Sequence, residues 1–368
     1  MAAFFSHNDV IMKHNFGAGP CILPKSVFEE ASNSVINFNG LSILEISHRS
    51  QDFVDIMEEA QSLVKKTLNV PEGYSVLFIQ GGASLGFTIS ALNMISSAKP
   101  TAGYVNTGTW SQGAINEAKN LGIKVNTIAS SKDKNFNYIP KNINITENFD
   151  FIHYTSNNTI FGTQFQDIVN TDLPLVCDMS SDIFSKKIDV SKFDIIYAGA
   201  QKNLGPAGAT LFIVKNKIFD KSFGGEFMPK YLNLKNHIDK KSMLNTPPVF
   251  SIYTSMLNLR YMNKIGGIDT IESNNNLKAL KLYEEIDSNP LFKSTVKGID
   301  RSKMNVTFLL TNESLKEIFD NMWNEAGIIG LKGHRSVGGY RASIYNALPL
   351  ESVEILIEVM KQFSKKNG

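Results

Sequence analysis

The stretch FDIIYAGAQKNLGPAGATLFIVK, residues 193–215, places two apolar runs of strand length on either side of a loop of small residues. FDIIYA leads directly into the loop from Gly199 to Pro206, and ATLFIVK follows the loop. A short apolar run bounded by turn residues is typical of a strand that is buried on both faces. The stretch therefore predicts two core strands, with Lys202 at the carboxyl end of the first.

Further strand candidates lie upstream of this stretch. They are YSVLFIQ, AGYVNTG, KVNTIAS, DFIHYTS and LPLVCDMS, which begin at residues 74, 102, 124, 150 and 173. Between them, GGASLGFTISALNMI and SQGAINEAKNLG have helical spacing. Strands that alternate with helices predict an α/β fold, with a mainly parallel sheet flanked by helices. In such sheets, ligands bind at the carboxyl ends of the strands.

Downstream the pattern changes to α+β. Helices are expected over 251–267, 268–286, 313–327 and 351–366, and strands over 301–310 and 339–346. We predict a large domain over 15–265 and a smaller α+β domain over 266–368, divided at Gly266–Gly267. The N-terminal residues 1–20 could pack with the smaller domain.

Composition excludes several classes of protein. The net charge of +2 is spread along the chain without a long basic tract, so we expect neither a nucleic-acid nor a membrane partner. No apolar run reaches the roughly 18–20 residues of a membrane helix. The N-terminus is too short and polar for a secretory signal. Two distant cysteines, Cys21 and Cys177, favour the reducing cytoplasm over a disulfide-bonded exterior.

Lys202 and Asp178 form the first candidate site. Asp178 ends the apolar run PLVCD, so both residues are expected at the ends of neighbouring strands. Pyridoxal phosphate (PLP) chemistry needs an amine to form a Schiff base and a carboxylate to keep the pyridine nitrogen protonated. A lone lysine of this kind is more often a surface charge, but the pair favours the cofactor as much as the surface. No metal site is predicted.

The turn Gln80-Gly81-Gly82-Ala83-Ser84 opens a predicted helix, whose free backbone N–H groups and Ser84 hydroxyl could bind an anion. A tight turn is the commoner reading of such glycines. Neither dinucleotide-binding nor Walker A spacing is present, which disfavours a nucleotide site. Trp110 begins another helix at the same rim of the sheet, where it could stack on a planar ring or pack in the core.

Two basic clusters complete the set of candidates. His48 and Arg49 lie in EISHRS, and His334, Arg335 and Arg341 lie in GHRSVGGYRAS. Arginine side chains suit carboxylate and phosphate oxygens, although such clusters are more often solvated faces. If both clusters face one cleft, the substrate is polyanionic.

From about Asn15 to the C-terminus, the chain resembles the phosphoserine aminotransferases, which are fold-type I PLP enzymes. The resemblance is carried by NFGAGP, EISHRS, the glycine turn, YAGAQKNLGPAG, LNTPPVF, RSKMNV and LKGHRSVGGYRASIYNALP. It implies a reversible reaction in serine biosynthesis: 3-phosphohydroxypyruvate and L-glutamate give O-phospho-L-serine and 2-oxoglutarate. The family would also allow a substrate of pyridoxine biosynthesis.

The resemblance also implies roles at the cofactor. Lys202 would form the Schiff base and Asp178 would partner the pyridine nitrogen. The other implied contacts are stacking by Trp110, cofactor binding by Thr159 and Gln201, and phosphate binding by Ala83 and Ser84. Asn245 and Thr246 would reach the phosphate from a second subunit, which makes the site a property of a homodimer.

For the substrate, the resemblance implies that Arg49 binds the carboxylate. His48, His334 and Arg335 would bind the phosphate, and Arg341 is counted among the substrate contacts. The chain departs from some family members at Ser84, where they have arginine, and at Ala18, where they have serine. MKHNFGAGP resembles a natural start, so residues before Met12 are interpreted as an extension.

Three rival functions remain open. A cysteine desulfurase-like enzyme or an alanine:glyoxylate-type aminotransferase would share the lysine, the aspartate and the fold, but has no use for a second basic cluster. A non-catalytic PLP-binding protein would require loss of Lys202 or Asp178, and both are present. A nucleotide-dependent oxidoreductase would need a glycine fingerprint, which is absent.

Overall fold

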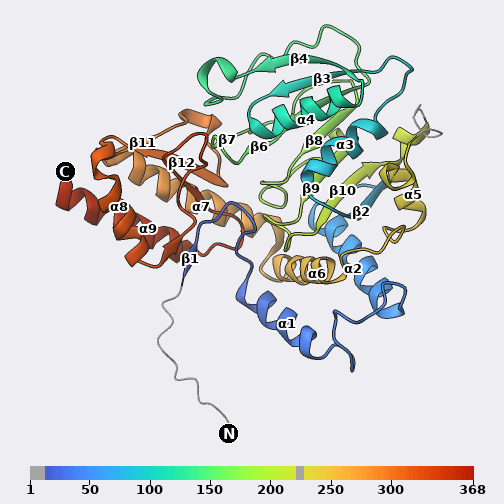
Figure 1. Cartoon of the computed structure of the whole chain (residues 1–368), viewed down its shortest axis with the longest axis horizontal. Helices are drawn as coiled ribbons and strands as arrows, with labels where there is room; N and C mark the ends of the chain where they lie inside the picture. The colour runs from blue at the N-terminus through green and yellow to red at the C-terminus, as the bar shows by residue number, and fades with distance from the viewer. Residues whose placement is uncertain (1–12, 221–227) are drawn as a thin grey trace.

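A computed structural model describes residues 13–220 and 228–368 (Figure 1). The expected N-terminal extension before Met12 lies outside these residues. The central sheet has seven strands in the order β2-β10-β9-β8-β5-β3-β4. Their bounds are β2 Tyr74–Gln80, β3 Thr101–Asn106, β4 Lys124–Ser130, β5 Phe151–Thr155, β8 Leu175–Asp178, β9 Ile195–Gly199 and β10 Ala209–Lys215.

The sheet is parallel except for β10, which runs antiparallel to both β2 and β9. The predicted α/β fold with a mainly parallel sheet is confirmed. β10 reverses direction because it follows β9 after one loop, without a crossover helix. That loop, residues 200–208, is called the lysine loop because it carries Lys202. It lies at the end of the sheet where the parallel strands have their carboxyl ends.

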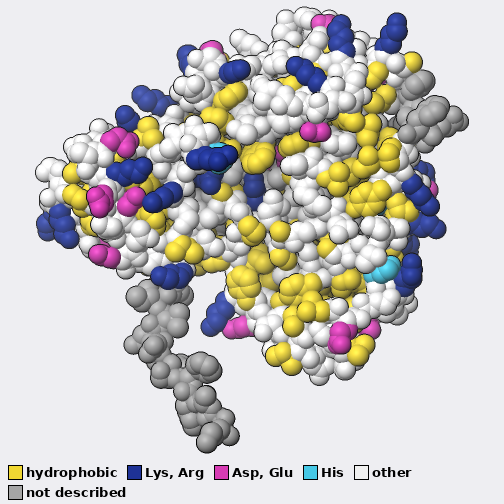
Figure 2. Space-filling model, in the orientation of Figure 1, with side chains coloured by type: hydrophobic (Ala, Val, Ile, Leu, Met, Phe, Trp, Pro, Cys, Tyr) yellow, Lys and Arg dark blue, Asp and Glu magenta, His cyan; other side chains and the backbone are white. Residues whose placement is uncertain are grey.

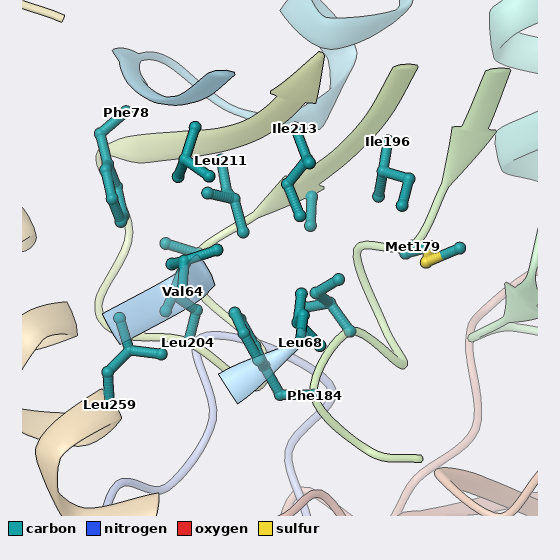
Figure 3. Close-up of a cluster of buried hydrophobic side chains, with 14 of the residues drawn as sticks. Val64, Leu68, Phe78, Met179, Phe184, Ile196, Leu204, Leu211, Ile213 and Leu259 are labelled. Atoms are coloured by element: carbon teal, nitrogen blue, oxygen red, sulfur yellow. The ribbon is translucent and has the colours of Figure 1, made fainter. Parts of the chain in front are cut away.

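Helices cover both faces of this sheet (Figure 1). The helices of this part are α1 Lys25–Ile36, α2 Gln51–Thr67, α3 Ala83–Asn93, α4 Thr109–Asn120, α5 Leu234–Asp239 and α6 Val249–Lys264. Alternate strand residues face opposite cores: Ile196 packs with α2 and α6, whereas Tyr197 packs with α3 and α4. Figure 3 shows the first of these cores, with Val64 of α2, Leu259 of α6 and Leu204 from the lysine loop.

The C-terminal part has its own layers. A three-stranded antiparallel sheet has the order β11-β12-β14 and is packed against three helices. The bounds are α7 Gly267–Ser288, β11 Phe292–Ser294, β12 Asn305–Leu310, α8 Lys316–Glu325, β13 Ile328–Ile329, β14 Tyr340–Ser343 and α9 Leu350–Asn367. A short hairpin of β6 Asn157–Asn158 and β7 Thr163–Gln164 lies near the junction of the two parts.

Two segments connect distant parts of the chain. β1, His14–Asn15, pairs in parallel with β13, and Phe16 is buried in the C-terminal core. α7 contributes Ile268 to the core of the large sheet and Leu282 to the C-terminal core. Because α7 contributes side chains to both cores, the division of the chain into domains at residues 265 and 266 stays a prediction.

On the face shown in Figure 2, Lys and Arg side chains are interspersed with Asp and Glu. No helix within 13–220 and 228–368 is long and apolar enough to cross a membrane. In the same residues, no group of three or more His, Cys, Asp or Glu side chains is arranged to bind a metal ion.

Candidate active site

Lys202 lies in the loop between β9 and β10, and only 8% of the residue is exposed. Its Nζ is 2.7 Å from Thr159 Oγ1 and 5.9 Å from the centroid of the Trp110 ring. Burial disfavours the ammonium form and lowers the pKa of Lys202 to about 8, although Asp178 opposes the shift. A buried amine with a depressed pKa is suited to act as a nucleophile near neutral pH.

The backbone around Lys202 is fixed from two sides. Cys21 donates its N–H to Gln201 O at 3.0 Å, and its thiol donates to Lys202 O. Asn258 of α6 donates its side-chain amide to Leu204 O at 2.8 Å. Gly205 passes so close to Ser255 that a Cβ there would collide with the Ser255 hydroxyl. The lysine is therefore carried on a rigid loop.

Asp178 is the last residue of β8, and it is buried. Ser180 donates to its Oδ1 through the backbone N–H at 2.9 Å and the hydroxyl at 2.5 Å. Because both bonds end on Oδ1, Oδ2 is left for another donor. Burial raises the pKa of Asp178, whereas the Ser180 hydrogen bonds and the charge of Lys202 lower it. A protonated ring nitrogen would supply the positive partner that this carboxylate needs.

The glycine turn connects β2 to α3. Gly81 has φ of +128°, a conformation that glycine adopts without strain, and α3 begins at Ala83. Backbone N–H groups in the first turn of a helix have no acceptor within it, so those of Ala83 and Ser84 can receive an anion. Trp110 is the second residue of α4 and is 37% exposed, which leaves part of its indole for a ligand.

Arg341 is a residue of the C-terminal part that contacts this site. It lies on β14 opposite Thr307, and its Nη1 is 3.4 Å from Thr159 O. Its Nε is buried without a hydrogen-bond partner among the described residues, as is Thr155 Oγ1 at the end of β5. Buried polar atoms are rarely left unpaired, so these two indicate a site that a ligand completes.

The two other basic groups make no direct contact with Lys202 or Asp178 among the hydrogen bonds of the described residues. Arg49 and Arg335 are exposed, and no described carboxylate pairs with either. His48 is half-buried, and His334 contacts Ser336 Oγ at 2.7 Å within its own loop. No hydrogen bond within the described chain joins either group to Lys202 or Asp178.

The remaining predicted residues lie around the glycine turn and the lysine loop. Asn245 and Thr246 are exposed in the loop between α5 and α6, and Asn245 Nδ2 is 3.5 Å from Gln80 Oε1 of the same chain. Gln201 is half-buried, and its side chain folds back toward Gly199. The contact with a second subunit stays a prediction.

Sequence reasoning missed several supporting residues. Ser180 follows Asp178 by two positions, a spacing at which aspartate often accepts from the backbone, so this partner had a readable signal. Cys21, Asn258 and Thr155 had none, because their contacts depend on how segments far apart in the chain are packed.

The residues fit pyridoxal phosphate. The site offers a buried amine, a buried carboxylate with an open oxygen, an exposed aromatic face and the N-terminus of a helix. These groups match the cofactor's aldehyde, pyridine nitrogen, ring and phosphate, respectively.

Comparisons with known proteins agree with this fit. The family model described as Aminotransferase class-V matches residues 13–356. A phosphoserine aminotransferase of Flavobacterium psychrophilum is 56% identical over 357 residues, which are 96% of this chain and 99% of that protein.

Solved structures give the same result. A phosphoserine aminotransferase from Bacillus circulans subsp. alkalophilus is 40% identical with a TM-score of 0.93, over 97% of this chain and 99% of that one. A PLP-bound phosphoserine aminotransferase from Trichomonas vaginalis is 34% identical with a TM-score of 0.89, over 95% and 100%. The chain therefore belongs to the class-V aminotransferases, as a PLP-dependent member of the phosphoserine aminotransferase family.

Proposed function

We propose that this enzyme transfers the amino group of L-glutamate to 3-phosphohydroxypyruvate, giving O-phospho-L-serine and 2-oxoglutarate, and that the reaction is reversible. The observation that carries the proposal is the near full-length identity of 56% to a protein named phosphoserine aminotransferase. The buried Lys202 and Asp178 supply the groups that transamination requires. Use of a pyridoxine-pathway substrate stays a prediction.

Each cofactor-side residue has a chemical role in this proposal. Bound PLP supplies an electron sink for the charge that develops at the substrate α-carbon. Lys202 Nζ would hold the cofactor covalently, and its free amine would move the α-proton as base and then as acid. Asp178 Oδ2 keeps a proton on the ring nitrogen. Trp110 covers the ring, and the N–H groups of Ala83 and Ser84 bind the phosphate.

The substrate side is assigned to the basic groups. Arg49 is proposed to bind the α-carboxylate that both amino donors share. His334 and Arg335, with His48, are proposed to bind the phosphate of phosphoserine. Arg341 has an unpaired, buried Nε beside Thr159, so it is placed to bind an anion close to the cofactor.

We further propose a homodimer in which Asn245 and Thr246 bind the cofactor phosphate of the partner subunit. The support is their exposure in a loop with two prolines, which disfavours a compact local fold. Analytical ultracentrifugation of the holoenzyme should show a dimer at assay concentrations. A fully active monomer would refute the shared site. The two free cysteines favour a cytoplasmic location.

A substrate comparison tests the proposed activity. The visible absorbance of the purified holoenzyme is followed on adding phosphoserine, glutamate, serine or alanine. Phosphoserine and glutamate should each convert the bound cofactor rapidly, whereas serine and alanine should react slower by orders of magnitude. Equal rates with alanine and phosphoserine would instead support an aminotransferase without a phosphate site.

A further inference from the structure

Lys278, in the middle of α7, is a buried cation that the proposed reaction does not use. Only 2% of the residue is exposed. Its Nζ donates to three backbone carbonyl oxygens, Ile344 O at 3.0 Å, Tyr345 O at 2.7 Å and Leu348 O at 3.1 Å. No described carboxylate lies within ion-pair distance of Nζ. Buried lysines without a partner anion are rare, so a specific function is expected of this one.

The three carbonyls belong to one turn, residues 344–348, which connects β14 to α9. An ammonium group has three N–H donors and a neutral amine has two, so only the charged form can donate to all three oxygens at once. Tyr345 O also accepts from the Leu348 N–H at 3.0 Å, whereas Ile344 O and Leu348 O depend on Lys278. Asn275, one helical turn earlier on α7, donates to Asn346 Oδ1 at 2.8 Å. Two buried polar side chains of α7, Asn275 and Lys278, therefore hydrogen-bond to this turn.

The turn 344–348 contacts the lysine loop directly. Asn346 donates its backbone N–H to Asn203 Oδ1 at 3.1 Å, and Asn203 is the residue that follows Lys202. On the other side, the Tyr345 hydroxyl donates to Ala18 O at 3.0 Å. Ala18 lies in the segment whose Cys21 binds the backbone of Gln201 and Lys202. Two hydrogen-bonded routes thus lead from Lys278 to the backbone that carries Lys202.

We propose that Lys278 is a positioning residue of the active site, whose ammonium holds the turn 344–348 in the shape that docks Asn346 on Asn203 and so fixes Lys202. The inference rests on the proposed role of Lys202. It adds a residue that touches neither cofactor nor substrate and acts through the backbone. A methionine at position 278 would leave Ile344 O and Leu348 O without this donor, and Tyr345 O with only the Leu348 N–H at 3.0 Å, so the turn could shift.

The charge of Lys278 depends on pH. Burial lowers the pKa of Lys278 to about 7, and the only titratable group that opposes this shift is the Cys21 thiol. Burial raises the pKa of that thiol to about 12, so it stays neutral and offers little compensation. The turn is therefore held by all three Lys278 bonds below about pH 7 and loses one of them as pH rises through the pKa of Lys278.

The test compares Lys278→Met with Lys281→Met in the holoenzyme. Lys281 is three residues along the same helix, exposed, and paired with Glu354 at 2.7 Å, so the control makes the same chemical change at a surface position. The first readout is the pH midpoint of the cofactor's visible absorbance, which reports the surroundings of Lys202 without any substrate. The second is kcat and KM in the glutamate half-reaction. The third is hydrogen exchange of residues 199–206 in the cofactor-free protein.

We expect Lys278→Met to shift the absorbance midpoint by about half a pH unit or more and to lower kcat about tenfold while KM changes less than about twofold. Exchange in 199–206 should rise, and Lys281→Met should leave all three readouts unchanged. A folded Lys278→Met enzyme with a lower melting temperature but a normal midpoint, kcat and exchange would make Lys278 a structural residue only and overturn the proposal.

If Lys278→Met does not fold, the contact between Asn346 and Asn203 can be tested instead. Asn203→Ala removes the oxygen that accepts from Asn346 and should shift the midpoint in the same way. An Asn203→Ala midpoint equal to that of the wild type would overturn the proposal. Because the midpoint needs no substrate, failure with phosphoserine would count against the proposed function alone.

Discussion

The residues proposed to bind the cofactor and those proposed to bind the substrate are held in different ways. Lys202 and Asp178 are buried at strand ends, each with hydrogen-bond partners at 2.9 Å or less. Arg49 and Arg335 are exposed on loops and pair with no described carboxylate.

This contrast separates two kinds of catalytic requirement. The cofactor reacts in every turnover at the same atoms, so its contacts are best fixed in advance by the sheet. Substrates enter and leave, and the proposed reaction has two different amino donors. Exposed arginines on loops, as proposed for Arg49 and Arg335, would be free to adjust to either donor. Substitutions on the cofactor side should therefore affect all substrates, and those on the substrate side should discriminate between them.

The largest effect is expected for Lys202→Ala. Without the amine, the enzyme has neither the covalent link nor the group that moves the α-proton, so transamination should be lost almost entirely with every donor. The fold should persist, because the loop is also fixed by Cys21, Asn258 and Leu204. Borohydride treatment followed by mass spectrometry should show cofactor bound to the wild type only. A reducible link in the variant would move the role to another lysine.

Asp178→Asn should have the next largest effect. The amide keeps the shape and the contact with Ser180 but cannot hold a positive charge on the ring nitrogen, so proton transfer should slow about 10²- to 10⁴-fold. The loss should be similar for glutamate and phosphoserine, because the cofactor side serves both. Single-turnover absorbance measurements test this. A near-normal rate would show that another group protonates the ring.

Lys202→Met should stabilise the cofactor-free protein at neutral pH. The pKa of Lys202 falls from 10.5 in an unfolded chain to about 8 when folded, so the unfolded state binds more protons between these values. At about 1.4 kcal/mol per pH unit, burying the ammonium costs at most about 3 kcal/mol below pH 8.

Since this cost disappears as the wild-type amine loses its proton, the stability advantage of Lys202→Met should shrink between pH 8 and pH 10.5. Urea unfolding at pH 7, 9 and 10.5 measures the advantage, with the exposed Lys281→Met as control. An advantage that did not change with pH would mean that the folded-state pKa of Lys202 is not depressed.

Arg335→Ala should have the smallest effect but the most selective. A charge-assisted hydrogen bond contributes about 1.5–3 kcal/mol, so phosphoserine turnover should fall roughly ten- to a hundredfold, and glutamate turnover should fall less. Arg49→Ala should reduce both half-reactions together, because every donor has an α-carboxylate. Following the half-reactions separately by absorbance distinguishes these patterns. Equal losses with both donors in Arg335→Ala would make the phosphate assignment wrong.

The sequence predicted the large sheet well, because its strands are short apolar runs separated by turns and helical patterns. It placed Lys202 and Asp178 at the ends of neighbouring strands, β9 and β8, for the same reason. It did not reveal α1 or α2, and the Ser50 cap that begins α2 was not recognised in advance. The contact of Arg341 Nη1 with Thr159 O could not be predicted, because it joins β14 to a segment far away in the sequence.

The pairing of β1 with β13 has a consequence for how the chain is made. His14 is translated long before its partner Ile328, because more than 300 residues separate the two in the sequence. At 5–20 residues per second, the interval is roughly 15–60 s. During that time the buried side chain of Phe16 has no C-terminal core to enter. The nascent chain therefore holds β1 unpaired for that interval, and the core that contains Phe16 can close only after β13 has been made.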